Sequence, residues 1–239
     1  MGIRGISSSF TKKVWGTISF NHFDEKSILW LNVNESSFIF ERGVFMKLKK
    51  EEKRNKIIQA AIRTFARNGY FNSRVSEIAK EAGVADGTIY IYFRSKDEIL
   101  SAIFDEALDK FVQVSEDKLK NILDPIERLE TIAFLHLQYL GANRDLATVF
   151  QIEFRHNIVF MEKFTRSKLR DYFRIIRETI EAGQKKQVFR KLDSKFGTKL
   201  FFGMIDEMVT SWLLSKKEYQ LENAAKSLTQ AFVFGLAES

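Results

Sequence analysis

The stretch that decides the fold runs from Val75 to Phe93 and reads VSEIAKEAGVADGTIYIYF. Apolar residues recur at helical spacing on both sides of Gly83, and glycine permits the tight turn that would join two short helices. Two helices joined in this way cross at a steep angle, which lets the second helix enter the major groove of DNA. The stretch therefore predicts a helix-turn-helix, with Val84 and Ile89 facing inward and locking the pair.

A longer helix is predicted before this stretch, over about residues 51–68. Its apolar residues lie at three- and four-residue spacing, which is typical of an amphipathic helix. They are Ile57, Ile58, Ala61, Ile62 and Phe65. We expect Gly69 to close this helix in a left-handed conformation and Ser73 to cap the next one, which ends at Ala82.

Further helix signals follow the stretch. After a short helix over about residues 86–93, Ser95 and Glu98 form a capping-box pattern that opens a longer helix. Asp124-Pro125-Ile126-Glu127 is another start signal, and Gly183 and Asp193 are predicted to mark later boundaries. The remaining helices are expected at about 125–141, 144–154, 157–183, 194–215 and 221–237. The fold class predicted is all-α.

The first 45 residues differ from the remainder, because they hold scattered aromatic side chains and no sustained helical period. One hypothesis is that residues 1–45 are a non-native extension and that the protein starts at Met46, since codons for Glu41-Arg42-Gly43 can resemble a ribosome-binding site. The alternative is a genuine N-terminal arm, and the nucleotide sequence of the gene would distinguish the two. We expect a DNA-binding domain over 46–100 and a ligand-sensing and dimerisation domain over 101–239.

Charge and composition narrow the class of protein. The formal net charge is +7, and residues 46–100 hold 12 basic and 7 acidic residues, a difference of +5. Either an anionic partner such as nucleic acid or a solvated basic face accounts for this excess. The chain has no cysteine and no apolar run of the roughly 18 residues that a membrane span needs. We expect a cytoplasmic protein with no membrane partner.

Polar side chains around the second short helix are the candidates for contact with double-stranded DNA. Gly87 would let the backbone approach DNA closely, and hydroxyl and cationic groups would meet phosphates or base edges. At the N-terminus of the preceding helix, free amide groups also attract phosphate. The predicted DNA-binding residues are Arg74, Ser76, Ala85, Gly87, Thr88, Tyr90, Tyr92 and Lys96.

These residues resemble the DNA-binding signature of the TetR family of repressors. The matching positions are Ile78-Ala79, Ala82-Gly83-Val84, Gly87-Thr88-Ile89-Tyr90, Tyr92-Phe93 and Ser95-Lys96. The resemblance implies a small N-terminal three-helix DNA-binding domain and a larger C-terminal helical domain for dimerisation and ligand sensing. Val75 departs from the pattern, because many relatives carry a phosphate-contacting threonine there. That contact would pass to Arg74, Ser76 or the backbone.

The C-terminal part resembles the acyl-CoA-responsive repressors of fatty-acid degradation, on three segments. They are Val84–Tyr90, Gln151–Arg155, and Phe202–Glu207 leading to Trp212. The resemblance implies a long-chain acyl-CoA effector, although ordinary core packing would account for most of the phenylalanines. The predicted apolar ligand contacts are Phe104, Phe111, Phe134, Phe150 and Phe154, with Phe160, Phe164 and Phe173 as further apolar volume.

Arginines spaced by four, four and three residues lie along one predicted helix face: Arg166, Arg170, Arg174 and Arg177. A guanidinium stripe suits the phosphates of coenzyme A, but pairing with nearby carboxylates at a solvated surface accounts for it equally simply. Arg155, on an otherwise apolar segment, is either a phosphate ligand or a buried ion-pair partner. We therefore count Arg155, Arg170 and Arg174 as candidate ligand contacts.

No catalytic residue, metal site or cofactor is predicted, because the chain lacks histidine pairs at metal-ligand spacing, a phosphate-binding glycine loop and a GxSxG motif. We expect a homodimeric repressor, not an enzyme, that binds a pseudo-palindromic operator and leaves it when it binds a small hydrophobic effector. Two alternatives stay open at this point. One is a repressor that senses a drug or a free fatty acid, and the other is a non-specific DNA-binding protein.

Overall fold

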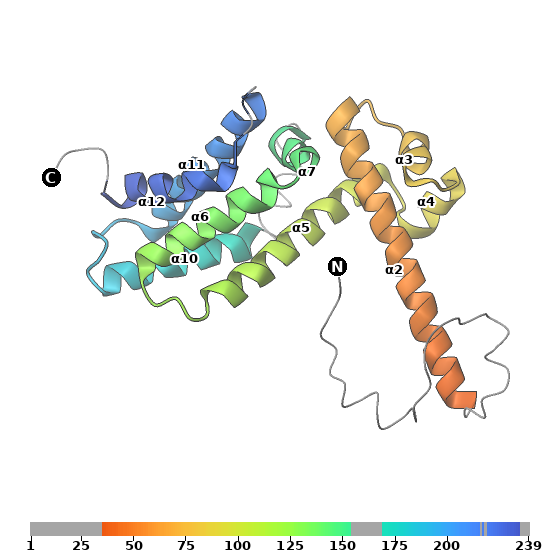
Figure 1. The fold of residues 1–239 in the computed structure, drawn as a ribbon, viewed down its shortest axis with the longest axis horizontal. Coiled ribbons are helices and arrows are strands. Elements are labelled where there is room, and N and C mark those ends of the chain that lie inside the picture. Colours follow the sequence, from red (N-terminus) through yellow and green to blue (C-terminus); the bar gives the residue numbers. More distant parts are fainter. Residues whose placement is uncertain (1–34, 154–168, 216, 218, 235–239) are drawn as a thin grey trace. The chain divides into compact units, whose positions relative to one another are not determined.

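The computed structural model describes residues 35–153, 169–215, 217 and 219–234, with side chains from Met46 onward (Figure 1). All regular secondary structure in these ranges is helical, as the sequence predicts. Among the described residues, those up to Lys50 belong to one compact unit and those from Glu51 onward to another. None of the helices in the described ranges is both long and apolar enough to cross a membrane.

Helix α2 spans Glu35–Asn68, so the predicted start near residue 51 is wrong. Side chains 46–50 are all exposed, so this part of the helix has no buried stripe and lacks the apolar period on which the prediction relied. Farther along, Ile57, Ala61 and Phe65 are fully buried. Full burial of a large aliphatic or aromatic side chain contributes about 1.5–3 kcal/mol relative to exposure, so this half of α2 anchors the N-terminal three-helix domain.

Helices α3 (Val75–Ala82) and α4 (Asp86–Tyr92) form the predicted helix-turn-helix. Gly83 takes the left-handed conformation, with φ of 66°, and the Val84 amide donates to the Ala79 carbonyl at 3.0 Å. Gly69 also has a positive φ, of 79°, as predicted for the end of α2. Because a left-handed residue is strained unless it is glycine, these two positions hold the turns in place.

The predicted role of Ser73 as a helix cap is wrong. Its hydroxyl is buried and donates to the Gly69 carbonyl at 2.7 Å, so it closes the loop after α2 instead. Arg74 occupies the N-cap position, and its backbone N–H donates to the Glu77 carboxylate at 2.8 Å. This is the half of a capping box in which the side chain three residues after the N-cap accepts from the N-cap backbone N–H. It satisfies one of the unpaired N–H groups at the start of α3.

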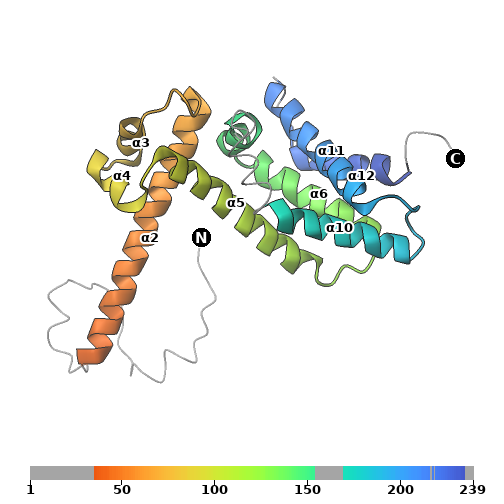
Figure 2. The same cartoon turned by 180° about the vertical axis from the view of Figure 1, so that it is seen from behind.

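The C-terminal domain starts from α5 (Lys96–Leu119), which also belongs to the DNA-binding domain. Helix α6 (Pro125–Gly141) lies centrally and contacts α5, α10, α11 and α12, as Figures 1 and 2 show from opposite sides. The caps predicted at Ser95 and Asp124 are confirmed, because each side chain accepts an amide hydrogen bond of 3.1 Å. The other elements are α10 (Leu169–Lys185), α11 (Ser194–Leu214), η3 (Leu221–Asn223) and α12 (Ala224–Phe234).

The helix predicted over about 144–154 is divided in the structure. An α-helical turn, α7 (Arg144–Thr148), continues into a π-helical turn, η2 (Val149–Glu153). Single π-helical turns are rare and are frequent at functional sites. The start of the helix predicted over 157–183 lies outside the described residues.

Gly183 does not end α10, which continues to Lys185, so that predicted boundary is wrong. Gly183 is buried, and a Cβ atom added there would lie 2.1 Å from the ring of Phe189. The glycine is therefore needed for close packing of a ring against the helix. The chain turns later, at Gln187, which has φ of 60°.

Candidate nucleic-acid interface and ligand-binding domain

Helix α4 has one buried and one open face. Ile89 is only 1% exposed and fixes the helix to the core, whereas Tyr90 is 58% exposed and Ile91 is 71% exposed. A Cβ atom added at Gly87 would meet nothing within 4 Å, so the backbone there lies open. The structure thus places Gly87 and Ile91, four residues apart, on the face opposite Ile89, with half-buried Thr88 at the edge of that face. The sequence did not single out Ile91.

The N-terminus of α3 presents a second exposed group. Arg74 and Ser76 are both exposed, and Ala85, at the N-cap of α4, is exposed as well. Thr88 is half-buried, and Tyr92 is half-buried and packs against the core. The predicted DNA-binding residues other than Lys96 are therefore at least partly exposed, and Tyr92 is the one that packs against the core.

Lys96, which is predicted to contact phosphate, also makes contacts within the DNA-binding domain. Its ammonium donates to the backbone carbonyls of Tyr70 at 2.7 Å, Phe71 at 3.3 Å and Ser73 at 2.9 Å, and it lies 4.4 Å from the centre of the Tyr70 ring. A lysine ammonium has three donors, and all three are occupied. Lys96 thus holds the loop between α2 and α3 against the start of α5.

Two polar pairs reinforce this part of the domain. The Tyr70 hydroxyl donates to the Asp97 carboxylate, and burial together with this contact raises the pKa of Tyr70 above its usual value. Arg54 pairs with Glu106 and also stacks over the ring of Phe93, 5.2 Å from its centre. These contacts fasten α2 to α5 and to the residue that ends α4, so α4 is held from several sides.

The interior of the C-terminal domain is aromatic, as predicted. Phe104 packs edge-on against Phe150 at 4.5 Å between ring centres, and Phe111 packs against Tyr172 at 4.7 Å. Phe173 packs against Phe202 at 5.1 Å. Phe134 is different: it is 39% exposed, because it points away from the buried face of α6, so its predicted place in the interior is wrong. Phe154, Arg155, Phe160, Phe164 and Arg166 lie outside the described residues.

A neutral histidine lies within this aromatic interior. His136 Nδ1 and the Tyr172 hydroxyl are 2.8 Å apart, and burial lowers the pKa of His136 to about 4. Burial is also the main cause that raises the pKa of Tyr172, with the nearby Asp206 carboxylate adding to it. Both side chains are therefore uncharged at neutral pH, which keeps the interior suited to an apolar molecule.

Gln151, on the π-helical turn η2, links that turn to α11. Its amide N–H donates to Asp206 Oδ1 at 2.7 Å, and its carbonyl oxygen accepts from the Thr210 hydroxyl at 3.0 Å. Gln151 is buried, and a buried amide that is bonded at both ends fixes the position of its segment. The sequence offered only an indirect signal for this link, the resemblance of residues 151–155.

The predicted phosphate-binding arginines lie among carboxylates. Arg174 pairs with Glu116 at 2.8 Å, with Glu178 at 3.4 Å and with Asp171 at 3.6 Å, and this cluster raises its pKa. Arg170 is exposed beside a pocket of about 360 Å³ that Glu116 and Asp171 also line. The structure therefore shows Arg174 in the ion-paired arrangement that the sequence allowed, and the pocket next to Arg170 has an acidic lining.

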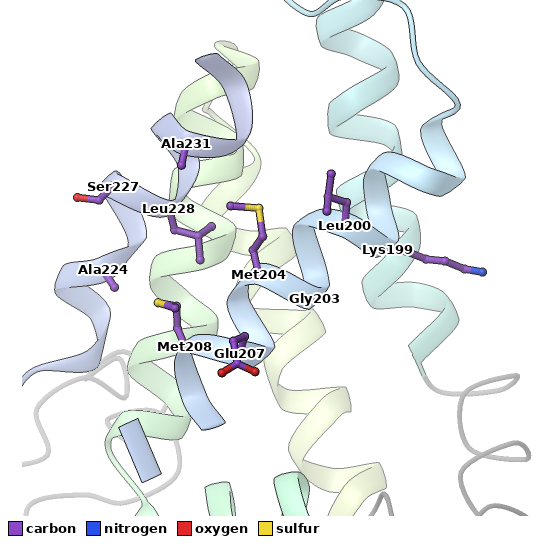
Figure 3. Close-up of a pocket in the computed structure, with 10 residues that line it drawn as sticks. All are labelled: Lys199, Leu200, Gly203, Met204, Glu207, Met208, Ala224, Ser227, Leu228 and Ala231. Carbon is purple, nitrogen blue, oxygen red and sulfur yellow. The ribbon is translucent and has the colours of Figure 1, made fainter. Parts of the chain in front are cut away.

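A shallow apolar groove of about 550 Å³ lies between α11 and α12. Figure 3 shows Met204, Met208 and Leu228 in the space between the two helices. Gly203, Ala224 and Ala231 also line it, and these small residues leave the two helix backbones accessible. Leu200, at one end of the groove, is exposed.

Comparison with known proteins extends the description. Residues 57–103 match the family model described as "Bacterial regulatory proteins, tetR family", and residues 104–235 match "YsiA-like protein, C-terminal region". The fatty acid metabolism regulator protein of Bacillus subtilis is 34% identical over 189 residues, which are 79% of this chain and 97% of the relative.

Solved structures agree with these matches. The crystal structure of FadR from Bacillus subtilis in complex with stearoyl-CoA is 35% identical, with a TM-score of 0.72, and the match covers 76% of this chain and 98% of that one. The fatty acid degradation regulator FadR from Bacillus halodurans is 34% identical, with a TM-score of 0.74, over 78% of this chain and 97% of that one.

The fold and the open face of α4 define a helix-turn-helix DNA-binding protein with a helical C-terminal domain. With the matches over both domains, the chain belongs to the TetR family of bacterial regulatory proteins, and it is a DNA-binding transcriptional regulator.

Arg74→Gln is expected to weaken binding to DNA of any sequence to a similar degree, because Arg74 is exposed and would contact phosphate rather than bases. Each lost phosphate contact reduces the slope of log K against log salt by about 0.9. Fluorescence anisotropy between low and moderate salt measures this slope. Arg190→Gln is the control, since Arg190 is exposed outside the DNA-binding domain. An unchanged slope for Arg74→Gln contradicts the assignment.

Proposed function

We propose that this regulator represses genes of fatty-acid degradation and leaves its operator when it binds a long-chain acyl-CoA. The observation that carries the proposal is the match to the Bacillus subtilis fatty acid metabolism regulator, which spans 97% of that protein and so includes both domains. A relative at this level of identity has been crystallised with stearoyl-CoA. The proposal also places the chain in the cytoplasm, where DNA and acyl-CoA are both present, and gives it no catalytic activity.

The aromatic interior supports an apolar effector. Rings of Phe111, Tyr172 and Phe202 pack against the neutral His136, and an acyl chain that entered among them would gain free energy by leaving water. An effector shifts the protein away from the DNA-bound conformation only through a difference in affinity for the two conformations. A coupling of about 1–3 kcal/mol changes operator affinity by roughly 5- to 150-fold.

One observation favours a second candidate, a TetR-type regulator that senses another hydrophobic molecule such as a free fatty acid or a drug. Arg174 is surrounded by three carboxylates, and the pocket beside Arg170 is acidic. A phosphate group would have to displace those carboxylates. In the acyl-CoA version, the phosphates therefore contact other cations, for which Arg155 is our candidate.

Titration of the operator complex with effectors separates the two candidates. We expect stearoyl-CoA to release the DNA at low micromolar concentration or below, while stearate and coenzyme A alone have little effect, because the acyl chain and the head group would each contribute to binding. The readout is anisotropy of labelled operator, with a scrambled duplex at the same salt as the specificity control. Release by stearate or aromatic cations but not by acyl-CoA contradicts the proposal.

The groove between α11 and α12 supports assembly into a homodimer. Its lining is mainly apolar, and exposed Leu200 extends it at one end. Packing the same pair of helices from a second copy across a two-fold axis would cover this surface and form a four-helix bundle. A dimer presents two copies of α4, which suits a pseudo-palindromic operator with half-sites in successive major grooves.

Met204→Glu is expected to shift the protein to monomers and to weaken operator binding by at least tenfold, because the dimer would bury an unpaired carboxylate. Light scattering coupled to gel filtration measures the mass. Gln138→Glu adds the same charge at an exposed position on α6 and serves as the control. A Met204→Glu protein that remains dimeric at low micromolar concentration contradicts this interface.

We also propose the division into 46–100 and 101–239, which the two family matches support because they meet between residues 103 and 104.

A further inference from the structure

Ile91 is the most exposed large apolar side chain of the DNA-binding domain. It is 71% exposed, near the end of α4, and it is not among the residues that pack against the core. Two positions earlier, Ile89 is buried. Two residues of an α-helix turn the direction of the side chain by roughly 200°, so Ile91 projects from the face opposite the one that fixes α4.

The side chain of Ile91 does little for the fold. Exposed apolar groups gain nothing from the hydrophobic effect, and isoleucine has a lower helix propensity than alanine or most long polar residues. Contact with a partner that covers Ile91 would be favourable, because the apolar surface of Ile91 would leave water. The side chain is also β-branched, so little rotamer freedom is lost when it is fixed against that partner.

The neighbours of Ile91 make it the projecting group of this face. Gly87, four residues earlier, has no side chain, and Thr88, three residues earlier, is small and half-buried. Ala85, at the N-cap, adds only a methyl group. On the face opposite Ile89, Ile91 is therefore the bulky apolar group, with Thr88 on one side of it and the exposed ring and hydroxyl of Tyr90 on the other.

We infer that Ile91 reads the 5-methyl group of a thymine in each operator half-site. In the major groove the thymine methyl is the apolar group among the donors and acceptors that base pairs display, and it accepts contacts from apolar side chains. Phosphate oxygens are charged and offer no apolar partner for a branched aliphatic side chain. The inference rests on the proposed function, since it assigns a base contact to the operator complex.

The test replaces single thymines of the operator by deoxyuridine, which removes the methyl group and keeps every hydrogen-bonding group. An operator is first selected from random duplexes with the full-length protein. We expect deoxyuridine at the contacted thymine in both half-sites to weaken binding by roughly 15-fold, the effect of two buried methyl groups. Ile91→Ala should weaken binding to the thymine duplex by a similar factor and show no further loss with deoxyuridine at that position.

Three further measurements distinguish this base contact from the loss of any exposed apolar side chain and from a loss of stability. Leu123→Ala removes an exposed apolar side chain elsewhere, because Leu123 is 80% exposed, and it should leave the affinity and the thymine preference unchanged. Ile91→Val keeps a branched methyl pair and should retain most of the preference. The melting temperature of Ile91→Ala should match that of the unmodified protein, since the site is exposed.

Two results would overturn the inference. One is an operator in which no deoxyuridine replacement weakens binding of the unmodified protein. The other is an Ile91→Ala protein that loses as much affinity on deoxyuridine replacement as the unmodified protein does at every thymine. Either result leaves effector-controlled operator binding intact, whereas failure of the selection to enrich any sequence would overturn the proposed function and this inference together.

Discussion

The ammonium group of Lys96 is the contact on which the DNA-binding surface depends. It lies among the carbonyls of Tyr70, Phe71 and Ser73 and above the Tyr70 ring, so one side chain from the start of α5 holds the whole loop that leads into α3. Backbone carbonyls in a loop need hydrogen-bond donors, and Lys96 supplies one to each of the three, while the Tyr70 carbonyl also accepts from the Ser73 amide at 3.3 Å. Because α3 and α4 are joined by the rigid Gly83 turn, fixing the loop also fixes the direction in which α4 presents Gly87, Thr88 and Ile91.

Helix α5, which carries Lys96, also links the DNA-binding domain to the C-terminal domain. Helix α5 carries Lys96 and Asp97 at its start, Phe104 in its middle and Phe111 farther on, so one helix contacts both the loop before α3 and the aromatic interior. A change in the packing of Phe104 or Phe111 would therefore act on a helix that also positions α4. Gln151 gives a second path, from the π-helical turn to α11 and its groove.

Local signals in the sequence were sufficient to predict the all-α fold and the helix-turn-helix. Gly83, the apolar residues of α2 and the caps at Ser95 and Asp124 act within a few residues of themselves, and the structure confirms them. The wrong predictions concern positions whose structure depends on residues distant in the sequence, or on the absence of an apolar stripe. Ser73 bonds back to α2, Gly183 makes room for Phe189, and the exposed start of α2 has no apolar stripe to reveal it. Phe134 follows the buried Ala133 in sequence but is exposed on α6. The contacts of Lys96 and the exposure of Ile91 likewise depend on the folded arrangement.

The salt dependence of operator binding by Lys96→Met tests most directly whether Lys96 organises the surface from within. The account predicts a loss of about 1–3 kcal/mol in the free energy of unfolding, because the hydrogen bonds from the Lys96 ammonium to the loop are lost, and a weaker operator complex. The slope of log K against log salt should stay unchanged, since no phosphate contact is lost. A slope that falls by about 0.9, with unfolding unaffected, would show that Lys96 neutralises a phosphate and would contradict the account.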